Sequence, residues 1–172
     1  SGTRFLAWRR AMIELDIREA LKNEGVAYTF HYEGIPDLGE DISFAKPLIL
    51  EAEYSVLKRK VSVRGTFETV LHTVCDRCLD EMETEVSCYF DETFSPDGTQ
   101  EEEEYAYRDD ALSLDKLVYD AIILNLPPQL LCSEECKGLC PQCGQNLNRK
   151  KCNCKQEDTD ETNPFAKLKG LF

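Results

Sequence analysis

Nine cysteines among 172 residues are the side chains with the clearest chemistry in this sequence. Eight of them fall into four closely spaced pairs: Cys75 with Cys78, Cys132 with Cys136, Cys140 with Cys143, and Cys152 with Cys154. A structural Zn²⁺ ion takes four tetrahedral ligands, and two thiolates on one short turn supply half of that set. The spacing therefore predicts zinc–thiolate chemistry.

The last two pairs lie close enough together to form a complete site by themselves. Gly144 directly follows Cys143, and glycine permits the tight backbone in which amide N–H groups point at sulfur. We therefore predict that Cys140, Cys143, Cys152 and Cys154 hold one zinc ion. The competing interpretations are disulfides and free buried thiols, and the paired spacing without a secretion signal favours a reducing cytosol instead.

The other two pairs are far apart in the sequence, and neither completes a tetrahedron alone. Combining Cys75 and Cys78 with Cys132 and Cys136 would give a second four-thiolate site and a second zinc ion. A different partition joins Cys132 and Cys136 to Cys140 and Cys143 and leaves the first pair reduced. The sequence leaves both partitions open.

A redox role for the first pair is the alternative to metal binding. Redox Cys-x-x-Cys motifs use a helix that starts at the motif to lower the thiol pKa. Here Leu79, Asp80 and Glu81 lead into a predicted strand and add negative charge, which is expected to raise the pKa. The ninth cysteine, Cys88, has the strand parity of apolar neighbours and is predicted to be a small core residue.

Other catalytic chemistry has little support in the sequence. The chain has two histidines, no glycine-rich phosphate loop, and carboxylates that occur in runs instead of as an isolated pair. We therefore predict that the protein is not an enzyme.

A short basic run lies inside the predicted C-terminal zinc loop. Arg149, Lys150 and Lys151 could offset the negative charge of zinc bound by four thiolates. The alternative is a small patch that contacts RNA phosphates. Both interpretations remain open at this point.

The net charge of −13 is concentrated in one part of the chain. Residues 75–131 contain 16 acidic and 3 basic side chains, so this segment accounts for the whole imbalance. Such a segment is either an exposed acidic face or a docking surface for a basic protein. No stretch approaches the ~20 apolar residues of a membrane helix, so no membrane partner is expected.

Alternating hydrophobicity predicts the strands that position these groups. Strands are expected at residues 12–15, 26–33, 48–56, 61–71 and 82–90, with a short helix starting after Asp16 and a turn at residues 58–60. Residues 95–110 are predicted to be a mobile acidic loop. A helix is expected from about Ser113, with an apolar stripe of Leu114, Leu117, Val118, Ala121, Ile122 and Leu124, and Pro127 and Pro128 end it.

These elements predict an α+β fold: a mainly antiparallel β-sheet covered by an α-helix, with a C-terminal Cys-rich zinc module. Three regions are expected. They are an α+β domain at residues 12–131, a zinc module at residues 132–155, and a linker with a short C-terminal helix at residues 156–172. The oligomeric state is left open.

The order of these motifs resembles the large ribosomal RNA subunit accumulation protein family (YceD/YlbN-like). The matching motifs are Cys75-Asp76-Arg77-Cys78-Leu79, Leu124-Asn125-Leu126-Pro127, and residues 131–154 and 163–171. The resemblance implies a cytoplasmic factor linked to large-subunit rRNA, without catalytic residues. We therefore expect a non-catalytic ribosome-biogenesis factor that binds a basic ribosomal protein or a large-subunit assembly intermediate. Direct rRNA binding and thiol-redox sensing are the alternatives.

Overall fold

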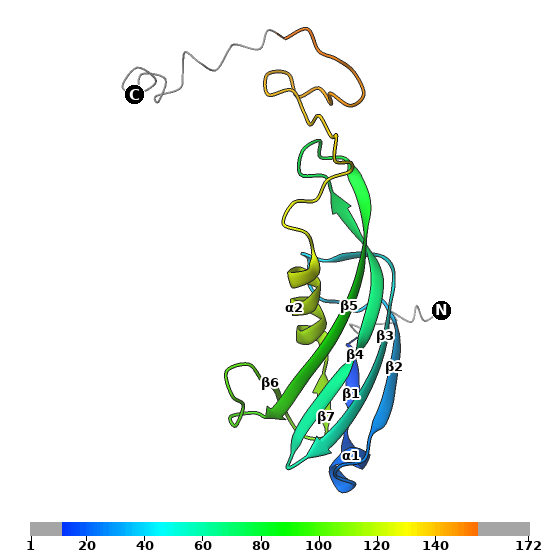
Figure 1. Ribbon diagram of the computed structural model, residues 1–172, viewed down its shortest axis with the longest axis vertical. Helices are drawn as coiled ribbons and strands as arrows, with labels where there is room; N and C mark the ends of the chain where they lie inside the picture. The colour runs from blue at the N-terminus through cyan, green and yellow to red at the C-terminus, as the bar shows by residue number, and fades with distance from the viewer. Residues whose placement is uncertain (1–11, 155–172) are drawn as a thin grey trace, which may run out of the picture.

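The computed structural model describes residues 12–154 as an elongated molecule built on one long, twisted β-sheet (Figure 1). The Cys-rich segment continues beyond one end of strands β4 and β5. The elements are β1 (Glu14–Asp16), α1 (Arg18–Lys22), β2 (Tyr28–Gly34), β3 (Ser43–Leu57), β4 (Lys60–Val74), β5 (Glu81–Pro96), β6 (Tyr105–Tyr107), β7 (Ala111–Ser113) and α2 (Asp115–Asn125). The predicted C-terminal linker and helix, residues 156–172, lie outside the described residues.

The main sheet has the order β2-β3-β4-β5-β6, and β1 pairs with β7 in a separate two-stranded sheet. Every strand pair is antiparallel except β5 with β6, which is parallel. The structure therefore confirms the expected mainly antiparallel β-sheet, which is accompanied by a small amount of helix. No helix among the described residues is long and apolar enough to cross a membrane.

The structure corrects the expectation for residues 95–110, which are not wholly irregular. Strand β6 pairs with the end of β5, and the Tyr105 ring stacks on Phe94 with 5.1 Å between ring centroids. Glu104 accepts hydrogen bonds from Ser95 Oγ at 2.7 Å and from Lys60 Nζ at 2.6 Å. Buried aromatic packing and an ion pair therefore order a segment whose composition suggested a loop.

The hairpin of β3 and β4 follows the predicted alternation. Leu57 pairs with Lys60, and the two residues between them have the positive φ angles of a tight hairpin turn, 50° for Lys58 and 63° for Arg59. The side chains of one parity are buried on each strand: Leu48, Leu50, Ala52, Tyr54 and Val56 on β3, and Val61, Val63, Phe67, Thr69 and Leu71 on β4.

The small N-terminal elements cover the other side of this core. Strand β1 lies one to two residues later than expected, and α1 has its N-cap at Ile17 instead of Asp16. Asp16 still contributes, because its Oδ1 accepts the Arg18 backbone N–H at 3.0 Å. Ile13, Leu15 and Ala20 are buried in the same cluster.

Helix α2 lies against the inner face of the sheet beside β5 (Figure 1). Its residues Leu117, Val118 and Ile122 are buried, as the predicted stripe requires. Leu124 was expected in that stripe, but it is 83% exposed. The reason is that β5 is the last strand at this level of the sheet, so no further strand covers the last turn of the helix.

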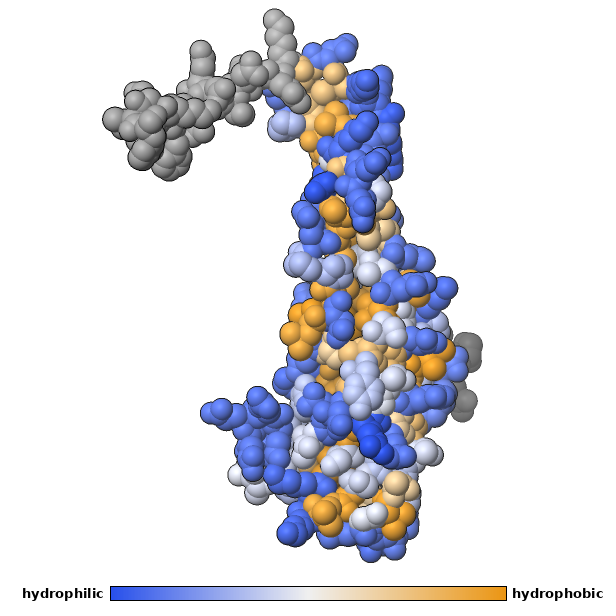
Figure 2. Space-filling view, viewed as in Figure 1, coloured by the Kyte–Doolittle hydropathy of each residue, from blue (hydrophilic) through white to orange (hydrophobic). Residues whose placement is uncertain are grey.

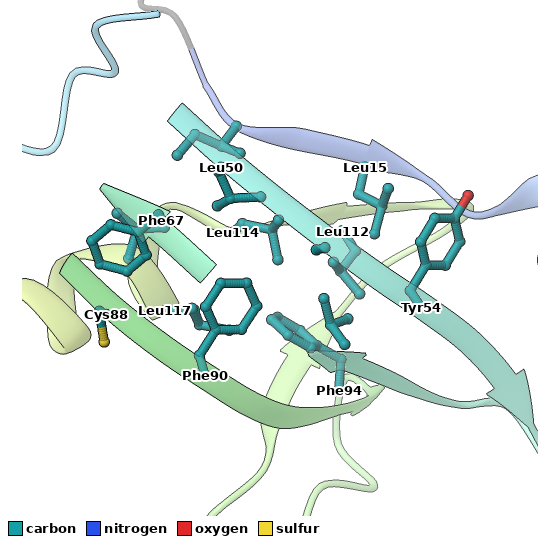
Figure 3. Packing of buried hydrophobic residues seen from close by; sticks show 14 of the residues in the cluster. Leu15, Leu50, Tyr54, Phe67, Cys88, Phe90, Phe94, Leu112, Leu114 and Leu117 are labelled. Carbon is teal, nitrogen blue, oxygen red and sulfur yellow. The ribbon is translucent and has the colours of Figure 1, made fainter. Parts of the chain in front are cut away.

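Figure 3 shows the core between the sheet and α2, with Phe67, Phe90 and Phe94 facing Leu114 and Leu117. Cys88 belongs to this cluster and is 8% exposed, which confirms its prediction as a core residue. Asn125 of α2 donates from Nδ2 to Cys88 Sγ at 3.1 Å. Burial raises the pKa of this thiol.

Candidate metal centres and charged surfaces

The eight paired cysteines come together as two groups of four within residues 12–154. The sulfur atoms in each group lie within 4.8 Å of one another. Group 1 consists of Cys75, Cys78, Cys132 and Cys136, and group 2 consists of Cys140, Cys143, Cys152 and Cys154. This arrangement differs from the partition that would have joined Cys132 and Cys136 to Cys140 and Cys143.

The sulfur spacings in group 1 suit a tetrahedral ion. Cys75 Sγ lies 3.8 Å from Cys136 Sγ, and Cys78 Sγ lies 3.7 Å from Cys132 Sγ. Four sulfurs at about 2.3 Å from a central Zn²⁺ ion are about 3.8 Å apart, whereas a disulfide requires about 2.05 Å. All nine cysteines are free thiols. The donor set and its spacing therefore fit zinc.

Group 1 is built at the far end of the hairpin of β4 and β5. Val74 pairs with Glu81, so Cys75 and Cys78 occupy the turn that joins the two strands. The segment after α2 returns to this turn: Asp76 N donates to Leu130 O at 2.7 Å, and Leu130 N donates to Asp76 Oδ2 at 2.6 Å. This pair of hydrogen bonds positions the following cysteines against the turn.

Backbone hydrogen bonds shape the turn around Cys75. Leu79 N donates to Cys75 O, and Cys75 N donates to Asp80 O, both at 2.9 Å. Leu79 has φ of 60°, the left-handed region that non-glycine residues rarely adopt. The backbone thereby folds around the sulfur of Cys75.

The turn around Cys140 repeats this geometry. Gly144 N donates to Cys140 O, and Cys140 N donates to Gln145 O, again both at 2.9 Å. Gly144 has φ of 71° and occupies the position that corresponds to Leu79. The two Cys-x-x-Cys turns are therefore the same structural unit used twice, once per group.

The electrostatics of each group lower the pKa of some thiols and raise the pKa of others; in group 1 the Asn148 side chain lowers the pKa of Cys136. Backbone N–H donation from Cys78 lowers the pKa of Cys75 to about 6. Backbone N–H donation from Cys143 likewise lowers the pKa of Cys140 to about 6. The acidic residues after Cys78 were expected to raise the thiol pKa of this pair. At Cys75 this is wrong because backbone amides lower the pKa, whereas the pKa of Cys78 is raised.

Other thiols move in the opposite direction. The side chain of Cys143, together with burial, raises the pKa of Cys154 to about 12. At Cys78 the Asp80 backbone N–H lowers the pKa, but burial and the neighbouring thiols outweigh it and raise the value to about 12. Four thiolates in one group therefore need a cation to offset their mutual repulsion.

The two groups are physically joined by the loop that follows Cys143. Asn148 donates from Nδ2 to Cys136 Sγ at 3.3 Å, and its Oδ1 accepts the Lys137 backbone N–H at 2.8 Å. Leu147 N also donates to Gly138 O at 2.9 Å. Asn148, which lies between Cys143 and Cys152 in the sequence, thus stabilises a thiolate of group 1.

Asp80 receives a second set of contacts from the same loop. Asn146 Nδ2 donates to its Oδ2 at 3.1 Å, and Arg149 Nη2 donates to its Oδ1 at 3.0 Å. Sequence reasoning missed Asn146 and Asn148, although amide side chains in a Cys-rich loop are a recognisable source of N–H···S bonds. Arg149 therefore makes a surface ion pair with Asp80, and its side chain is 70% exposed.

The other two members of the basic run differ from Arg149 in their ion pairing. Lys150 and Lys151 are exposed. Neither makes an ion pair in the part of the chain that the structure describes. The structure therefore separates Arg149 from the two lysines with which it was grouped in the sequence.

The acidic side chains of residues 75–131 cover two adjoining surfaces. On β5, Glu81, Glu83, Glu85 and Asp91 share the exposed parity. Residues 101–104 line a hollow together with Asp91, Glu92 and Thr93. Figure 2 shows this loop as a hydrophilic projection beside the sheet.

Residues 63–172 match the family described as Large ribosomal RNA subunit accumulation protein YceD, and the match covers more than half of the chain. The protein belongs to the YceD family. This confirms the resemblance found in the sequence, and the description of the family links it to accumulation of large-subunit ribosomal RNA.

Several relatives match parts of this chain. An uncharacterized protein of Mycobacterium tuberculosis is 33% identical over 106 residues, which is 58% of this chain and 51% of that protein. The chloroplastic YCED homolog 1 of Arabidopsis thaliana is 36% identical over 50 residues, 29% of this chain and 16% of that protein. The chloroplastic YCED homolog 1 of Zea mays is 37% identical over 65 residues, which is 37% of this chain and 21% of that protein. The chain spans about half the length of its mycobacterial relatives, and no solved structure matches it.

Proposed function

We propose that this YceD-family protein is a non-catalytic, cytoplasmic ribosome-biogenesis factor that supports accumulation of large-subunit (23S) rRNA. It acts by binding a basic ribosomal protein or a large-subunit assembly intermediate. Besides family membership, the observation that supports this most is the acidic surface. Glu83, Glu85 and Glu103 are exposed and make no ion pair among the described residues, so they are available to a basic partner.

In this proposal the two groups of cysteines each hold one zinc ion with a structural role. Four thiolates complete the coordination and leave no open position for catalysis. Group 1 would fix the end of the β4–β5 hairpin to the segment after α2, and group 2 would fix the loop that contains Asn148. The acidic face of β5 then has a rigid end instead of a flexible one.

Two alternatives remain distinct from this proposal. Direct rRNA binding would rely on Arg149, Lys150 and Lys151, but the contact between Arg149 and Asp80 favours an internal role for that residue. A thiol-redox sensor would cycle Cys75 and Cys78 without bound metal. Salt-sensitive rRNA affinity that depends on the two lysines would support the first alternative.

A matched pair of charge-reversal variants tests the function. Glu83, Glu85 and Glu103 are changed together to lysine, and the control changes Glu14, Glu24 and Glu40, which are exposed acids elsewhere on the protein. Each variant replaces the protein in cells depleted of it, and the ratio of large- to small-subunit rRNA is measured together with the co-purifying large-subunit proteins. We expect the first variant to lower the ratio of large- to small-subunit rRNA and to lose the co-purifying proteins. We expect the control to keep both at the level of the unsubstituted protein. Equal behaviour of the two variants would contradict the proposal.

A further inference from the structure

Strand β5 has an open edge over most of its length. Its 16 residues pair with β4 from Glu81 to Phe94, but on the other side β6 pairs only with residues 94–96. Within residues 12–154, positions 81–93 therefore have no strand on the side opposite β4. An edge of this kind presents backbone N–H and C=O groups that another chain can bind.

The hydrogen-bond phase identifies which residues present these groups. Cys75 N donates to Asp80 O at 2.9 Å, next to the ladder pair of Val74 and Glu81, so even-numbered residues of β5 turn their backbone toward β4. Odd-numbered residues from 81 to 91 turn theirs toward the open edge. The pairing with β6 agrees with this phase, because Asp97 N, an odd-numbered position directly after β5, donates to Tyr107 O of β6 at 2.9 Å.

A hollow follows this edge where it passes α2. Its lining includes the five consecutive β5 residues 88–92 together with Leu117, Ala121 and Leu124 of α2. Consecutive strand residues point to opposite faces, so a hollow that touches all five lies along the edge itself. Leu124 is 83% exposed beside it, and Figure 2 shows hydrophobic surface over α2.

The two sides of the edge differ in chemistry. On the outer face the exposed side chains next to it are four acids, Glu81, Glu83, Glu85 and Asp91, with Ser87 and Tyr89 between them. On the inner side the apolar residues of α2 border it. Like-charged edges repel, so pairing with a second copy of this chain is disfavoured, whereas a basic segment is attracted.

We infer that the open edge of β5 binds, by strand addition, an extended segment of a basic protein in which Lys or Arg alternates with apolar residues. In an added strand, successive side chains point to opposite faces. The basic side chains would contact the acidic row of β5, and the apolar side chains would contact Ala121 and Leu124. This inference rests on the proposed function, because it specifies how the basic partner is held.

Peptides test the backbone pairing directly. A labelled peptide of about nine alternating Lys and Val residues spans positions 83–91 of β5, and fluorescence anisotropy at low salt measures its affinity. Two further peptides carry N-methyl groups on either the Lys or the Val backbone, which keeps the charge and removes one set of N–H donors. We expect one methylated peptide to bind at least about tenfold more weakly than the other. Equal affinities for both would overturn the inference.

Protein variants provide the matched test. Ser87→Pro removes an N–H that faces the edge and leaves the β4 pairing intact, and Leu124→Arg places charge at the hollow. Leu57→Arg is the control, because Leu57 is 61% exposed at the β3–β4 turn. We expect the first two to weaken peptide binding about tenfold or more and the control to change it less than about twofold. Leu124→Arg decides the matter if Ser87→Pro does not fold.

The remaining outcomes separate this inference from the proposed function. Peptide binding that survives both edge variants overturns the inference, while the function stands if reversal of Glu83, Glu85 and Glu103 still abolishes rRNA accumulation. If that reversal has no effect, the proposed function fails. A dimer in sedimentation that Ser87→Pro dissociates would show that a second copy occupies the edge, and this also overturns the inference.

Discussion

Replacing Asn148 by alanine probes the link between the two groups of cysteines. The change removes the hydrogen bond to Cys136 Sγ at 3.3 Å and leaves the Lys137 N–H without its acceptor. A hydrogen bond to a charged group contributes about 1.5–3 kcal/mol, which corresponds to roughly 10- to 100-fold in affinity. Loss of a hydrogen bond to a metal ligand has an effect of similar size. Among the described residues no hydrogen bond joins Asn148 to a sulfur of group 2, so only one of two zinc ions is expected to bind more weakly.

Competition with a chromogenic chelator measures this effect, because two classes of zinc release are resolved by concentration. Asn125→Ala is a matched control, since Asn125 donates to the non-ligand thiol of Cys88 at 3.1 Å. In Asn148→Ala we expect one class of zinc to bind roughly 10- to 100-fold more weakly and the other to stay unchanged. In the control we expect neither class to shift. Identical release curves for the two variants would refute the reasoning that Asn148 stabilises a zinc-bound thiolate.

Three further predictions follow from the structure. Gly144→Val forces a β-branched residue into φ of 71°, so zinc binding by group 2 should weaken by about 1–2 kcal/mol in chelator competition. An unchanged competition curve would contradict the role of this turn in zinc binding. Lys60 holds the pKa of Glu104 down from 4.5 to about 2, so Glu104 stabilises the fold above pH 4.5 and this contribution is lost as the pH falls toward 2. Urea unfolding should therefore show a shallower acid loss of stability in Glu104→Gln, and parallel pH curves would contradict it. Chelation of zinc should speed amide exchange at residues 75–80 and 130–148 but not in β3, and uniform acceleration would show that the sheet itself depends on the metal.

The sheet was largely predictable because exposure alternates with a period of two. Burial of one parity on β3 and β4 follows directly from hydrophobicity, and the turn at Lys58 and Arg59 follows from polarity between two apolar runs. Strand β6 was not predictable, because three residues beside a run of glutamates carry no local signal. Its position depends on Tyr105 packing against Phe94 and on the ion pair of Glu104 with Lys60.

The candidate sites divide in the same way. Short cysteine spacings indicate paired ligands, but the association of Cys75 and Cys78 with Cys132 and Cys136 depends on α2 returning the chain to the β4–β5 turn. The contacts of Asn148 and Arg149 also join residues that are distant in the sequence, so no periodic pattern in the sequence indicates them. Exposure of Leu124 reflects where the sheet ends, which the periodicity of the helix does not encode.

The number of zinc ions bound per chain tests the central claim most directly. Protein purified without added metal is analysed by elemental mass spectrometry, with protein concentration measured independently. Two groups of four thiols predict two zinc ions per chain and a fall to one in Cys143→Ser. A count of one or none in the unsubstituted protein would contradict the account.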